Sequence, residues 1–398
     1  MHIEAVIGAN YGDEGKGLFT EYLCRNRPSP LVVLSNGGCQ RGHTVNNVEH
    51  GIRHVFHHFG SGTLLNVPSV FSKTFLLNPI KYIEEKKELE SIGIKPTAFR
   101  APGCLVQLPC DMLTNQAIER ARGFGRHGSC GWGIWETKVR NSEHALLSFE
   151  QFASYDCKKK MATYLDCLEW QIENRLKGVY APIYAEELSH VKDNGFIAHF
   201  IKDFEDMARE VKALDSDSLL EADLGICGFD AETLVVECGQ GLLLDKKYAP
   251  IDENGSTDIH TTPSSCGMVG AVDAVGDGID ASIVTANYVS RTYFTRHGAG
   301  PFPEEDASVA FKDETNISNE YQGSLRFGKI DETSAAQLLI RIAYDALGGC
   351  VPNANRYNLV MTHCNEAMPS AKAMSHASFF SFEDDSRKFL RRSDMFKK

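Results

Sequence analysis

The stretch IEAVIGANYGDEGKG, residues 3 to 17, decides the fold of this chain. Its first five residues form an apolar run that predicts a buried parallel strand. Glycines at 12, 15 and 17 free the backbone N–H groups that follow to curl around an anion. Residues 18 to 23 then place apolar side chains at the spacing of a helix's buried stripe. We therefore expect a strand, an anion-binding loop and a helix whose positive end faces a phosphate.

The loop differs from the P-loop motif GxxxxGK[ST]. Six residues separate Gly8 from Gly15, and Gly17 stands after Lys16 where the motif has Ser or Thr. Asp13 lies inside the loop, where a carboxylate beside phosphates is repulsive unless a cation lies between them or the carboxylate acts as a base. Asp13 is therefore the first candidate for chemistry, and the alternative is a glycine-rich turn with a solvated Asp13 and Lys16.

The composition indicates a globular protein that holds anions only in a local pocket. The 398 residues are 42% hydrophobic and 24% charged, enough for one large α/β domain or for two domains. A formal net charge of -12 disfavours nonspecific nucleic-acid binding. The twelve cysteines form no CxxC pair, and neither a secretory segment nor a long apolar run is found. We expect reduced thiols and a cytoplasmic location, with no metal cluster and no membrane insertion.

Several apolar runs lead into glycine-rich or polar loops, which is typical of buried parallel strands followed by functional turns. They lie at residues 3–7, 31–34, 234–236, 242–244 and 359–361. Residues 151 to 220 instead predict helices, with stretches such as FEDMAREVKAL that have one apolar and one charged face. We expect an α/β fold with a large, mostly parallel central sheet flanked by helices, similar to P-loop NTPases. Residues 1–398 would form one domain that includes the helical flank 151–220.

Seven motifs carry a resemblance to a known family. GDEGKG at 12–17 and GGCQRGHT at 37–44 resemble the two signature loops of adenylosuccinate synthetases, ligases that join aspartate to C6 of inosine monophosphate (IMP). The other matches follow in chain order: HHFGSGTL at 57–64, ERARG at 119–123, GSCGWGI at 128–134, ECGQGLLLD at 237–245 and TRHGAGPFP at 295–303. The resemblance therefore covers most of the chain.

Joining nitrogen to a purine C6 requires the 6-oxo group to become a better leaving group. A triphosphate donates its γ-phosphoryl group to O6 while a base takes the N1 proton, and the aspartate amine then displaces phosphate. The resemblance implies that Asp13 is the base, that His43 is the acid or electrostatic group and that Gln240 presents a catalytic amide. It also implies Mg²⁺ held by Asp13 and the carbonyl oxygen of Gly42, and a homodimer.

The same resemblance assigns the binding residues. The triphosphate would be bound by Gly12, Glu14, Gly15, Lys16, Gly17, Gly42, Thr44, Arg326, His363 and Asn365. The purine monophosphate would be bound by Asp13, Lys16, Gln40, Arg41, Ser129, Cys130, Arg140, Gln240, His260 and Thr261. L-Aspartate would be bound by Ser324 and Arg326.

Some of these positions depart from the family pattern. Ser129 and Cys130 stand where the family has two threonines, so one hydroxyl becomes a thiol, which is a poor donor. Arg140 is the nearest candidate for an arginine that reaches across a dimer to the neighbour's nucleotide. Arg326 ends a shortened loop that lacks the family's consecutive arginines, whose planar guanidinium groups clamp the aspartate carboxylates.

The stretch Thr362-His-Cys-Asn365 bears on the choice of nucleotides. The family recognises guanine here through an Asp, whereas an asparagine can donate to adenine N1 and accept from N6, so ATP is favoured over GTP. Cys364-Asn365 also resembles a phage branch of the family that makes 2-aminoadenylosuccinate from deoxyguanylate. That branch replaces the catalytic Asp with a small residue, which makes room for the 2-amino group. Because Asp13 is retained, IMP is the favoured acceptor, and (d)GMP stays open.

Two other classes of function compete with this ligase. The first is a different ATP-dependent ligase or kinase on the same scaffold, suggested by the altered aspartate loop. The second is a noncatalytic nucleotide sensor that keeps the phosphate loop, against which the presence of both Asp13 and His43 argues.

Overall fold

The computed structural model describes residues 1–48, 51–227, 229–248, 260–262, 264–277, 279–280, 283–313, 315–316, 318, 321–347 and 357–395. Ten strands form one central sheet in the order β14-β13-β12-β9-β1-β8-β2-β5-β6-β7. Their bounds are β1 His2–Gly8, β2 Pro30–Leu34, β5 Ser69–Phe71, β6 Ala98–Arg100, β7 Lys212–Ala213, β8 Thr233–Gly241, β9 Val284–Arg291, β12 Tyr357–Thr362, β13 Ala377–Ser381 and β14 Phe389–Arg391. Only the β13–β14 pair is antiparallel among them, so the prediction of a large, mostly parallel sheet is confirmed.

The strand predictions hold for four of the five apolar runs. The run 242–244 is the exception, because Leu242–Leu244 is a 3₁₀ turn. The β8 ladder already ends at Gly241, and the Asp245 N–H then donates to the Leu242 carbonyl at 3.0 Å, which closes the turn. The leucines are apolar because Leu242 is buried beside the sheet, not because they extend a strand.

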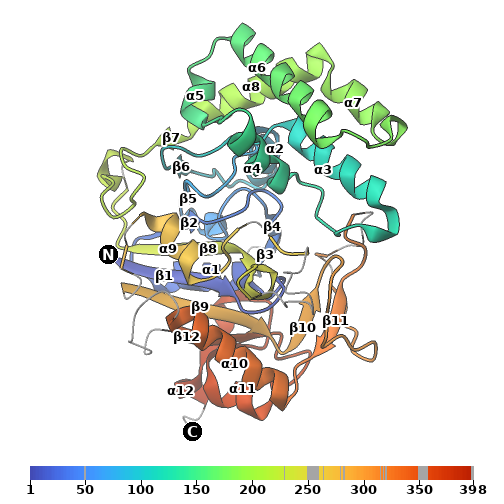
Figure 1. Ribbon diagram of the computed structural model, residues 1–398. Coiled ribbons are helices and arrows are strands. Elements are labelled where there is room, and N and C mark those ends of the chain that lie inside the picture. Colours follow the sequence, from blue (N-terminus) through green and yellow to red (C-terminus); the bar gives the residue numbers. More distant parts are fainter. Residues whose placement is uncertain are drawn as a thin grey trace.

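Two short antiparallel pairs stand apart from the main sheet. One is the hairpin of β3 (His43–Asn47) and β4 (Ile52–Phe56), and the other joins β10 (Tyr293–Arg296) to β11 (Arg326–Lys329). Both follow strands of the central sheet along the chain, so they lie near its edge where the functional loops leave (Figure 1).

The helices divide into three groups. Near the sheet are α1 (Lys16–Asn26), α9 (Met268–Val275), α10 (Glu332–Leu347), α11 (Ala371–His376) and α12 (Arg392–Met395). Between the sheet and the upper part of the molecule are α2 (Pro79–Ser91), α3 (Pro109–Arg122) and α4 (Ile134–Glu143). The upper part holds α5 (Phe149–Ala153), α6 (Cys157–Trp170), α7 (Ala185–Val191) and α8 (Asn194–Glu210), where a helical flank was predicted (Figure 1). Nowhere in the described ranges does a helix have the length and apolar character that a membrane crossing requires.

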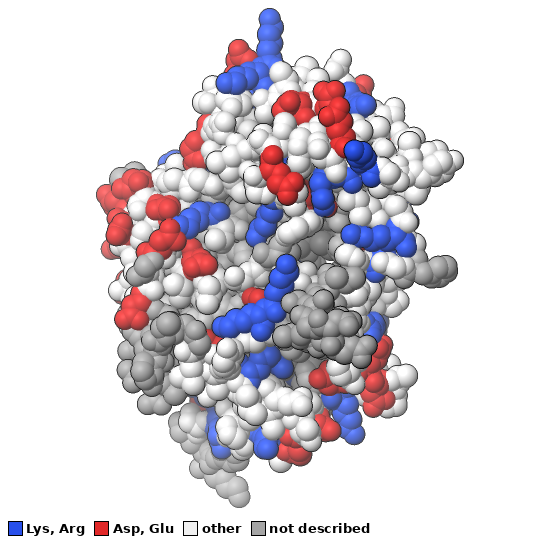
Figure 2. Space-filling model, viewed as in Figure 1, with Lys and Arg blue, Asp and Glu red and all other residues white. Residues whose placement is uncertain are grey.

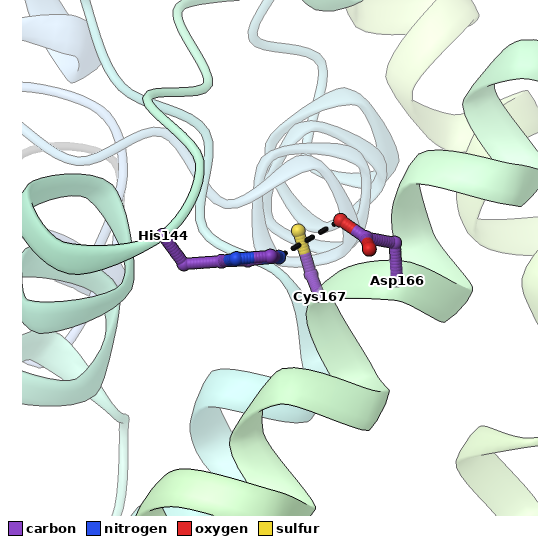
Figure 3. A group of neighbouring side chains, drawn as sticks. All are labelled: His144, Asp166 and Cys167. Carbon is purple, nitrogen blue, oxygen red and sulfur yellow. Dashed lines mark hydrogen bonds and ion pairs between the residues drawn. The ribbon is translucent and has the colours of Figure 1, made fainter.

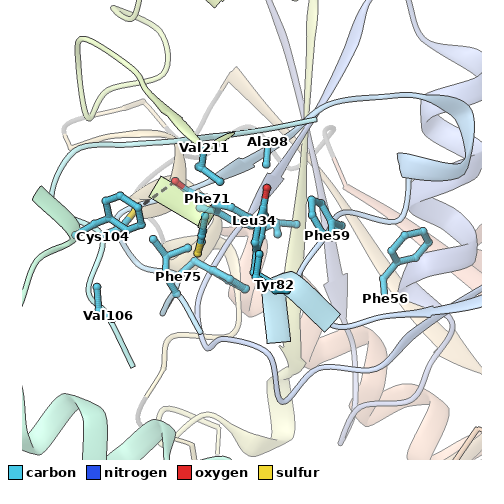
Figure 4. Close-up of a cluster of buried hydrophobic side chains, with 14 of the residues drawn as sticks. Leu34, Phe56, Phe59, Phe71, Phe75, Tyr82, Ala98, Cys104, Val106 and Val211 are labelled. Carbon is cyan, nitrogen blue, oxygen red and sulfur yellow. Dashed lines mark hydrogen bonds between the residues drawn. The ribbon is translucent and has the colours of Figure 1, made fainter. Parts of the chain in front are cut away.

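The core is split by the sheet into two layers. Successive residues of β2 alternate between them, with Val32 and Leu34 on the face of α1 and Leu31 and Val33 on the face of α9 and α10. This is the period-two pattern of a strand that is buried on both sides. Aromatic side chains from loops, from β5 and from α2 fill the first layer toward the helical flank, including Phe59, Phe71, Phe75 and Tyr82 (Figure 4).

Candidate functional site

A large cleft opens at the carboxyl ends of the central strands, where open α/β sheets usually bind ligands. Its volume is about 1490 Å³. The residues that follow β1, β9 and β12 line it, together with the end of β8 and the start of the β3–β4 hairpin. On the face drawn in Figure 2, Lys and Arg side chains lie along the middle of the molecule, whereas many Asp and Glu side chains gather on its left side. The lining of the cleft itself carries both signs of charge, with Lys16, Arg41 and Arg291 as well as Asp13, Glu14 and Asp313.

Most of the predicted site residues meet in this cleft. Those that line it are Gly12, Asp13, Glu14, Gly15, Lys16, Gly17, Gln40, Arg41, Gly42, His43, Thr44, Ser129, Cys130, Gln240, His260, Thr261, His363 and Asn365.

The glycine-rich loop after β1 is held from inside by Glu14. The buried Glu14 carboxylate accepts the Asn10 N–H at 3.0 Å and the Gly12 N–H at 2.8 Å, and it pairs with Lys16 Nζ at 2.8 Å. Burial alone would raise the pKa of Glu14, but Lys16 and these N–H donors outweigh it and leave the pKa below its usual value. Because the Glu14 carboxylate already accepts hydrogen bonds from within the loop, only the backbone of Glu14 is left to contact a phosphate.

The loop leaves the amino end of α1 open to an anion. Gly15 is the N-cap, with φ of 91°, and no side chain caps the helix. A side chain at Gly15 would be strained by this φ, and its Cβ would meet the Thr362 methyl carbon at 3.3 Å. The Thr362 hydroxyl also donates to the Glu14 carbonyl at 2.7 Å, which ties the loop to the end of β12. The first-turn N–H groups of α1 therefore stay available for phosphate oxygens.

Asp13 lies at the centre of the loop in the left-handed backbone region, with φ of 61°. The Arg291 Nε donates to the Asp13 carbonyl at 2.5 Å, whereas no group in the described ranges hydrogen-bonds the carboxylate itself. Burial raises the pKa of Asp13, and Arg291 and Lys16 oppose that rise. The result is a carboxyl group that lines the cleft with its oxygens uncommitted.

His43 is oriented by a buried carboxylate. Its Nδ1 lies 2.7 Å from Oε1 of Glu237, which also accepts the Ser61 hydroxyl and N–H, and Arg41 Nη2 lies 3.3 Å from the same group. Burial would raise the pKa of Glu237, but Arg41 and His43 bring it down to about 2, so Glu237 is ionised. Burial lowers the pKa of His43 to about 4 despite Glu237. The ring is therefore neutral near pH 7, with Nδ1–H facing Glu237 and a buried Nε2 that has no hydrogen-bond partner in the described ranges.

The residues beside His43 are held by their own loop. Gln40 turns back so that its Oε1 accepts the Gly38 N–H at 2.6 Å. Arg41 is buried, and its guanidinium donates to the carbonyls of His57 at 3.2 Å and Phe59 at 2.7 Å. Both side chains shape the loop more than they extend into the cleft.

At the far side of the cleft lie the GSCGWGI loop and the end of β12. The Ser129 hydroxyl pairs with Asn115, at 3.0 Å from Nδ2, while burial raises the pKa of the Cys130 thiol to about 11. His363 has φ of 56°, and burial lowers its pKa to about 3 with Arg291 adding to the effect. Asn365, two residues on, is exposed at the rim of the cleft.

Comparison with known proteins identifies the family. The family model described as adenylosuccinate synthetase matches residues 5–326. This chain belongs to the adenylosuccinate synthetase family. An adenylosuccinate synthetase of Vibrio vulnificus is 29% identical over 306 residues, and adenylosuccinate synthetase 2 of Chromobacterium violaceum is 31% identical over 312 residues. These matches cover 75% of this chain but only 63% and 64% of the two relatives, so the chain spans less than two thirds of their length.

Two solved structures share the fold. The fully ligated adenylosuccinate synthetase of Plasmodium falciparum gives a TM-score of 0.60 at 17% identity, covering 90% of this chain and 76% of that chain. The succinoaminodeoxyadenylate synthetase of cyanophage S-2L, bound to dGMP and to dATP as an energy donor, gives 0.61 at 14% identity. That match covers 99% of this chain and 97% of the phage chain, so the two folds correspond from end to end.

Arg140 requires a correction to what the family resemblance implied. Its side chain is fully buried, with Nε donating to Asp111 Oδ1 at 2.8 Å and Nη2 donating to Asp111 Oδ2 at 2.9 Å. Another bond from Nη2 reaches the Val106 carbonyl at 2.9 Å. An arginine with this buried aspartate as its partner does not reach across a dimer to a nucleotide, and Arg140 does not line the cleft.

The residues predicted to bind L-aspartate also lie outside the cleft lining. Arg326 forms an ion pair with Glu305, with Nε 2.9 Å from Oε1, and donates to the Gly300 carbonyl at 2.9 Å. Ser324 is exposed. Arg296 does line the cleft, but it is buried and donates to the carbonyls of Ala299 and Pro301. In this arrangement these arginines are committed to the loop that follows β10.

Three residues that hold the loops and side chains of the site escaped the sequence reasoning. Glu237 lies inside a quoted motif, but nothing local indicates that its carboxylate orients His43. Arg291, at the end of β9, also pairs with Asp313 at 2.8 Å, and Arg341 on α10 donates to the Ala9 carbonyl at 3.0 Å. The sequence offered one signal for the two arginines. An arginine that lies near the end of a buried parallel strand needs a hydrogen-bond acceptor, and acceptors are found in the loops at the strand ends.

Proposed function

We propose that this chain is a ligase that joins L-aspartate to C6 of a 6-oxopurine nucleoside monophosphate and uses a nucleoside triphosphate as the energy donor. One observation carries the proposal. Asp13 and His43 line one cleft beside the open amino end of α1. In the described ranges neither the Asp13 carboxylate nor Nε2 of His43 has a hydrogen-bond partner. Together they offer a base, a polarisable imidazole and a phosphate cradle.

The proposed reaction begins with proton removal at N1 of the purine by the Asp13 carboxylate. Burial raises the pKa of Asp13, which makes it a better base than an exposed aspartate, and Arg291 and Lys16 oppose that rise. The electrons released toward O6 let this oxygen attack the γ-phosphorus of the triphosphate, whose bond to the bridging oxygen breaks so that the nucleoside diphosphate leaves. The aspartate amine then forms the C6–N bond, and phosphate leaves with O6.

His43 is proposed to stabilise the transferring phosphoryl group. In the ligand-free protein Nε2 is unprotonated and carries a lone pair. This lone pair and the oxygens of a phosphate are both hydrogen-bond acceptors, so they repel each other. A polyanion at this position favours the protonated ring, and the ionised Glu237 balances the charge from the other side. His43 therefore becomes a hydrogen-bond donor to the phosphoryl group when the triphosphate is bound.

The donor set also fits a Mg²⁺ ion. Asp13 offers carboxylate oxygens with no hydrogen-bond partner in the described ranges, and the Gly42 carbonyl lies in the same cleft lining. Hard oxygen ligands together with phosphates suit Mg²⁺. When bound, the ion would neutralise the phosphate charge that builds up beside Asp13.

For the nucleotides, we propose IMP as acceptor and ATP as donor. Asp13 occupies the position at which the phage branch makes room for a purine 2-amino group, and Asn365 offers the donor and acceptor pair that suits adenine. The alternative acceptor is (d)GMP. It is supported by the end-to-end correspondence with the cyanophage enzyme, whose solved structure holds dGMP and dATP.

An acceptor screen tests the proposal. The purified chain is incubated with IMP, dIMP, GMP or dGMP, each with L-aspartate and with ATP, dATP or GTP, and both phosphate and the succinylated nucleotide are measured. We expect product with IMP and ATP, and none when aspartate is omitted. Product only with dGMP would move the assignment to the alternative acceptor, and phosphate release without a succinylated nucleotide would refute the ligase.

The family resemblance also supports a cytoplasmic homodimer. Sedimentation of the purified chain at several concentrations tests the oligomeric state. A monomer at all concentrations would contradict it.

A further inference from the structure

Away from the cleft, three side chains of metal-binding chemistry meet where α4 ends against α6. Nε2 of His144, a carboxylate oxygen of Asp166 and Sγ of Cys167 all lie within 4.8 Å of one another. Figure 3 shows the Cys167 sulfur beside the line that joins the imidazole to the carboxylate. We propose that His144, Asp166 and Cys167 form a binding site for a zinc-class divalent cation, which joins α4 to the helical flank.

The imidazole is already held in place for this role. His144 is the C-cap residue of α4, and its N–H donates to the Arg140 carbonyl at 3.0 Å. Its ring stacks on Trp170 with a centroid distance of 5.3 Å and an interplanar angle of 8°. Because Trp170 lies on the same helix as Asp166 and Cys167, α6 supplies both the ligands and the surface that orients the third ligand.

The ligand atoms need little movement to surround an ion. In a tetrahedral zinc site with ligand distances of about 2.0 to 2.3 Å, neighbouring ligand atoms lie roughly 3.5 Å apart. His144 Nε2 and Asp166 Oδ2 are now 2.8 Å apart, as a hydrogen-bonded pair, and would separate slightly to admit the ion. Rotation of the exposed Asp166 side chain provides this movement while the His144 ring stays stacked on Trp170.

The mixed nitrogen, oxygen and sulfur set determines the class of cation. A thiolate and an imidazole select Zn²⁺ over Mg²⁺ or Ca²⁺, which prefer oxygen ligands. Three protein ligands leave the fourth position to water, and the exposed carboxylate and imidazole leave an entry path from solvent.

A cation can bind Cys167 only if the thiol loses its proton. Burial raises the pKa of Cys167 to about 11, and the nearby Arg140 lowers it less strongly than burial raises it. In the metal-free protein the thiol is therefore protonated near pH 7. A bound cation must displace this proton, so binding releases about one proton from Cys167.

The test uses the full chain without nucleotides, after treatment with a chelator, titrated separately with Zn²⁺ and Cd²⁺. We expect one equivalent to bind, a thiolate-to-Cd²⁺ charge-transfer band in the ultraviolet, and one sulfur with nitrogen and oxygen ligands in zinc X-ray absorption. The melting temperature should rise with Zn²⁺.

Three variants and one matched control locate the site. His144→Gln, Asp166→Asn and Cys167→Ser should each weaken Zn²⁺ binding by at least about 10- to 100-fold, the loss that even supporting residues cause. Cys157→Ser removes an exposed thiol from the same helix and should change nothing. Should Cys167→Ser fold poorly, the two exposed variants still decide the outcome. Unchanged zinc binding in His144→Gln and Asp166→Asn, or the absence of a thiolate band in the parent chain, overturns the proposal. Neither readout depends on ligase activity.

Discussion

Asp13 combines two features that a solvated loop aspartate lacks. Its backbone is in the left-handed region, which a non-glycine residue seldom adopts, and its half-buried carboxylate has no hydrogen-bond partner in the described ranges. Arg291 holds the Asp13 carbonyl, so the backbone conformation is imposed by a contact with the end of β9. The carboxylate is therefore positioned for a ligand and not for the stability of the loop.

We expect Asp13→Asn to leave a folded protein that turns over roughly 10² to 10⁴ times more slowly, because the amide cannot take the N1 proton. Steady-state kinetics with the acceptor found by the screen measure the loss, and circular dichroism checks the fold. Asp384→Asn is the matched control, since Asp384 lies at the exposed rim of the same cleft and should retain normal turnover. Near-normal turnover of Asp13→Asn would exclude the proposed base.

His43 supports a second prediction at this scale, on proton uptake. Its pKa of about 4 in the ligand-free protein is expected to rise when phosphate oxygens approach Nε2. Triphosphate binding near pH 6 should therefore take up a substantial fraction of a proton. Calorimetric titrations in two buffers of different ionisation enthalpy measure this uptake.

The variant His43→Gln should abolish the proton uptake, and His144→Gln, outside the cleft, should not. Equal binding enthalpies in both buffers for the parent chain would contradict the role given to His43.

Among the secondary-structure elements, α3 and α4 are locked together by one buried carboxylate. Asp111 on α3 accepts two bonds from Arg140 on α4 and one at 2.8 Å from Gln171, directly after α6. It also accepts the Leu108 N–H at 3.0 Å and the Thr137 hydroxyl at 3.1 Å. The GSCGWGI loop, which lines the cleft, runs between these two helices, so the Asp111–Arg140 pair indirectly fixes one wall of the site.

The variant Arg140→Met should lower the free energy of unfolding by about 3 to 5 kcal/mol, since removing one partner leaves Asp111 buried and unpaired. Urea unfolding measures this change. Asp206→Asn, which breaks the solvent-exposed pair with Lys202, is the control and should have no measurable effect. If Arg140→Met unfolds at the same urea concentration as the parent, Arg140 does not hold the helices together.

On the scale of the whole molecule, several buried or partly buried histidines are neutral in the folded protein. Burial lowers the pKa of His43 to about 4 and those of His58 and His363 to about 3. The unfolded chain binds protons at histidine near pH 6.5. Below that pH the unfolded state binds protons at these histidines and the folded state does not, so the free energy of unfolding falls as the pH falls.

Each such histidine should reduce the free energy of unfolding by up to about 1.4 kcal/mol per pH unit between roughly pH 6 and pH 4. Urea unfolding at several pH values measures the slope. His58 lies among the rings of Phe71, Phe75 and Tyr82, away from the cleft lining. His58→Leu should therefore lower the slope whatever it does to absolute stability. A slope identical to that of the parent would show that His58 is not neutral in the folded protein.

By itself the sequence determined the unit from β1 to α1, most strands of the sheet and the membership of Asp13 and His43 in one site. These features depend on local patterns: apolar runs between glycines, the spacing of apolar residues on a helix, and loops at strand ends. Only the tertiary structure decided the partners. Glu237 lies 194 residues from His43 and meets it because β8 pairs with β2, the strand that leads into the His43 loop. Arg291 reaches Asp13 because β9 pairs with β1. Whether an arginine faces a ligand or a buried carboxylate, as with Arg140, depends on how separate helices pack, and no local pattern encodes that.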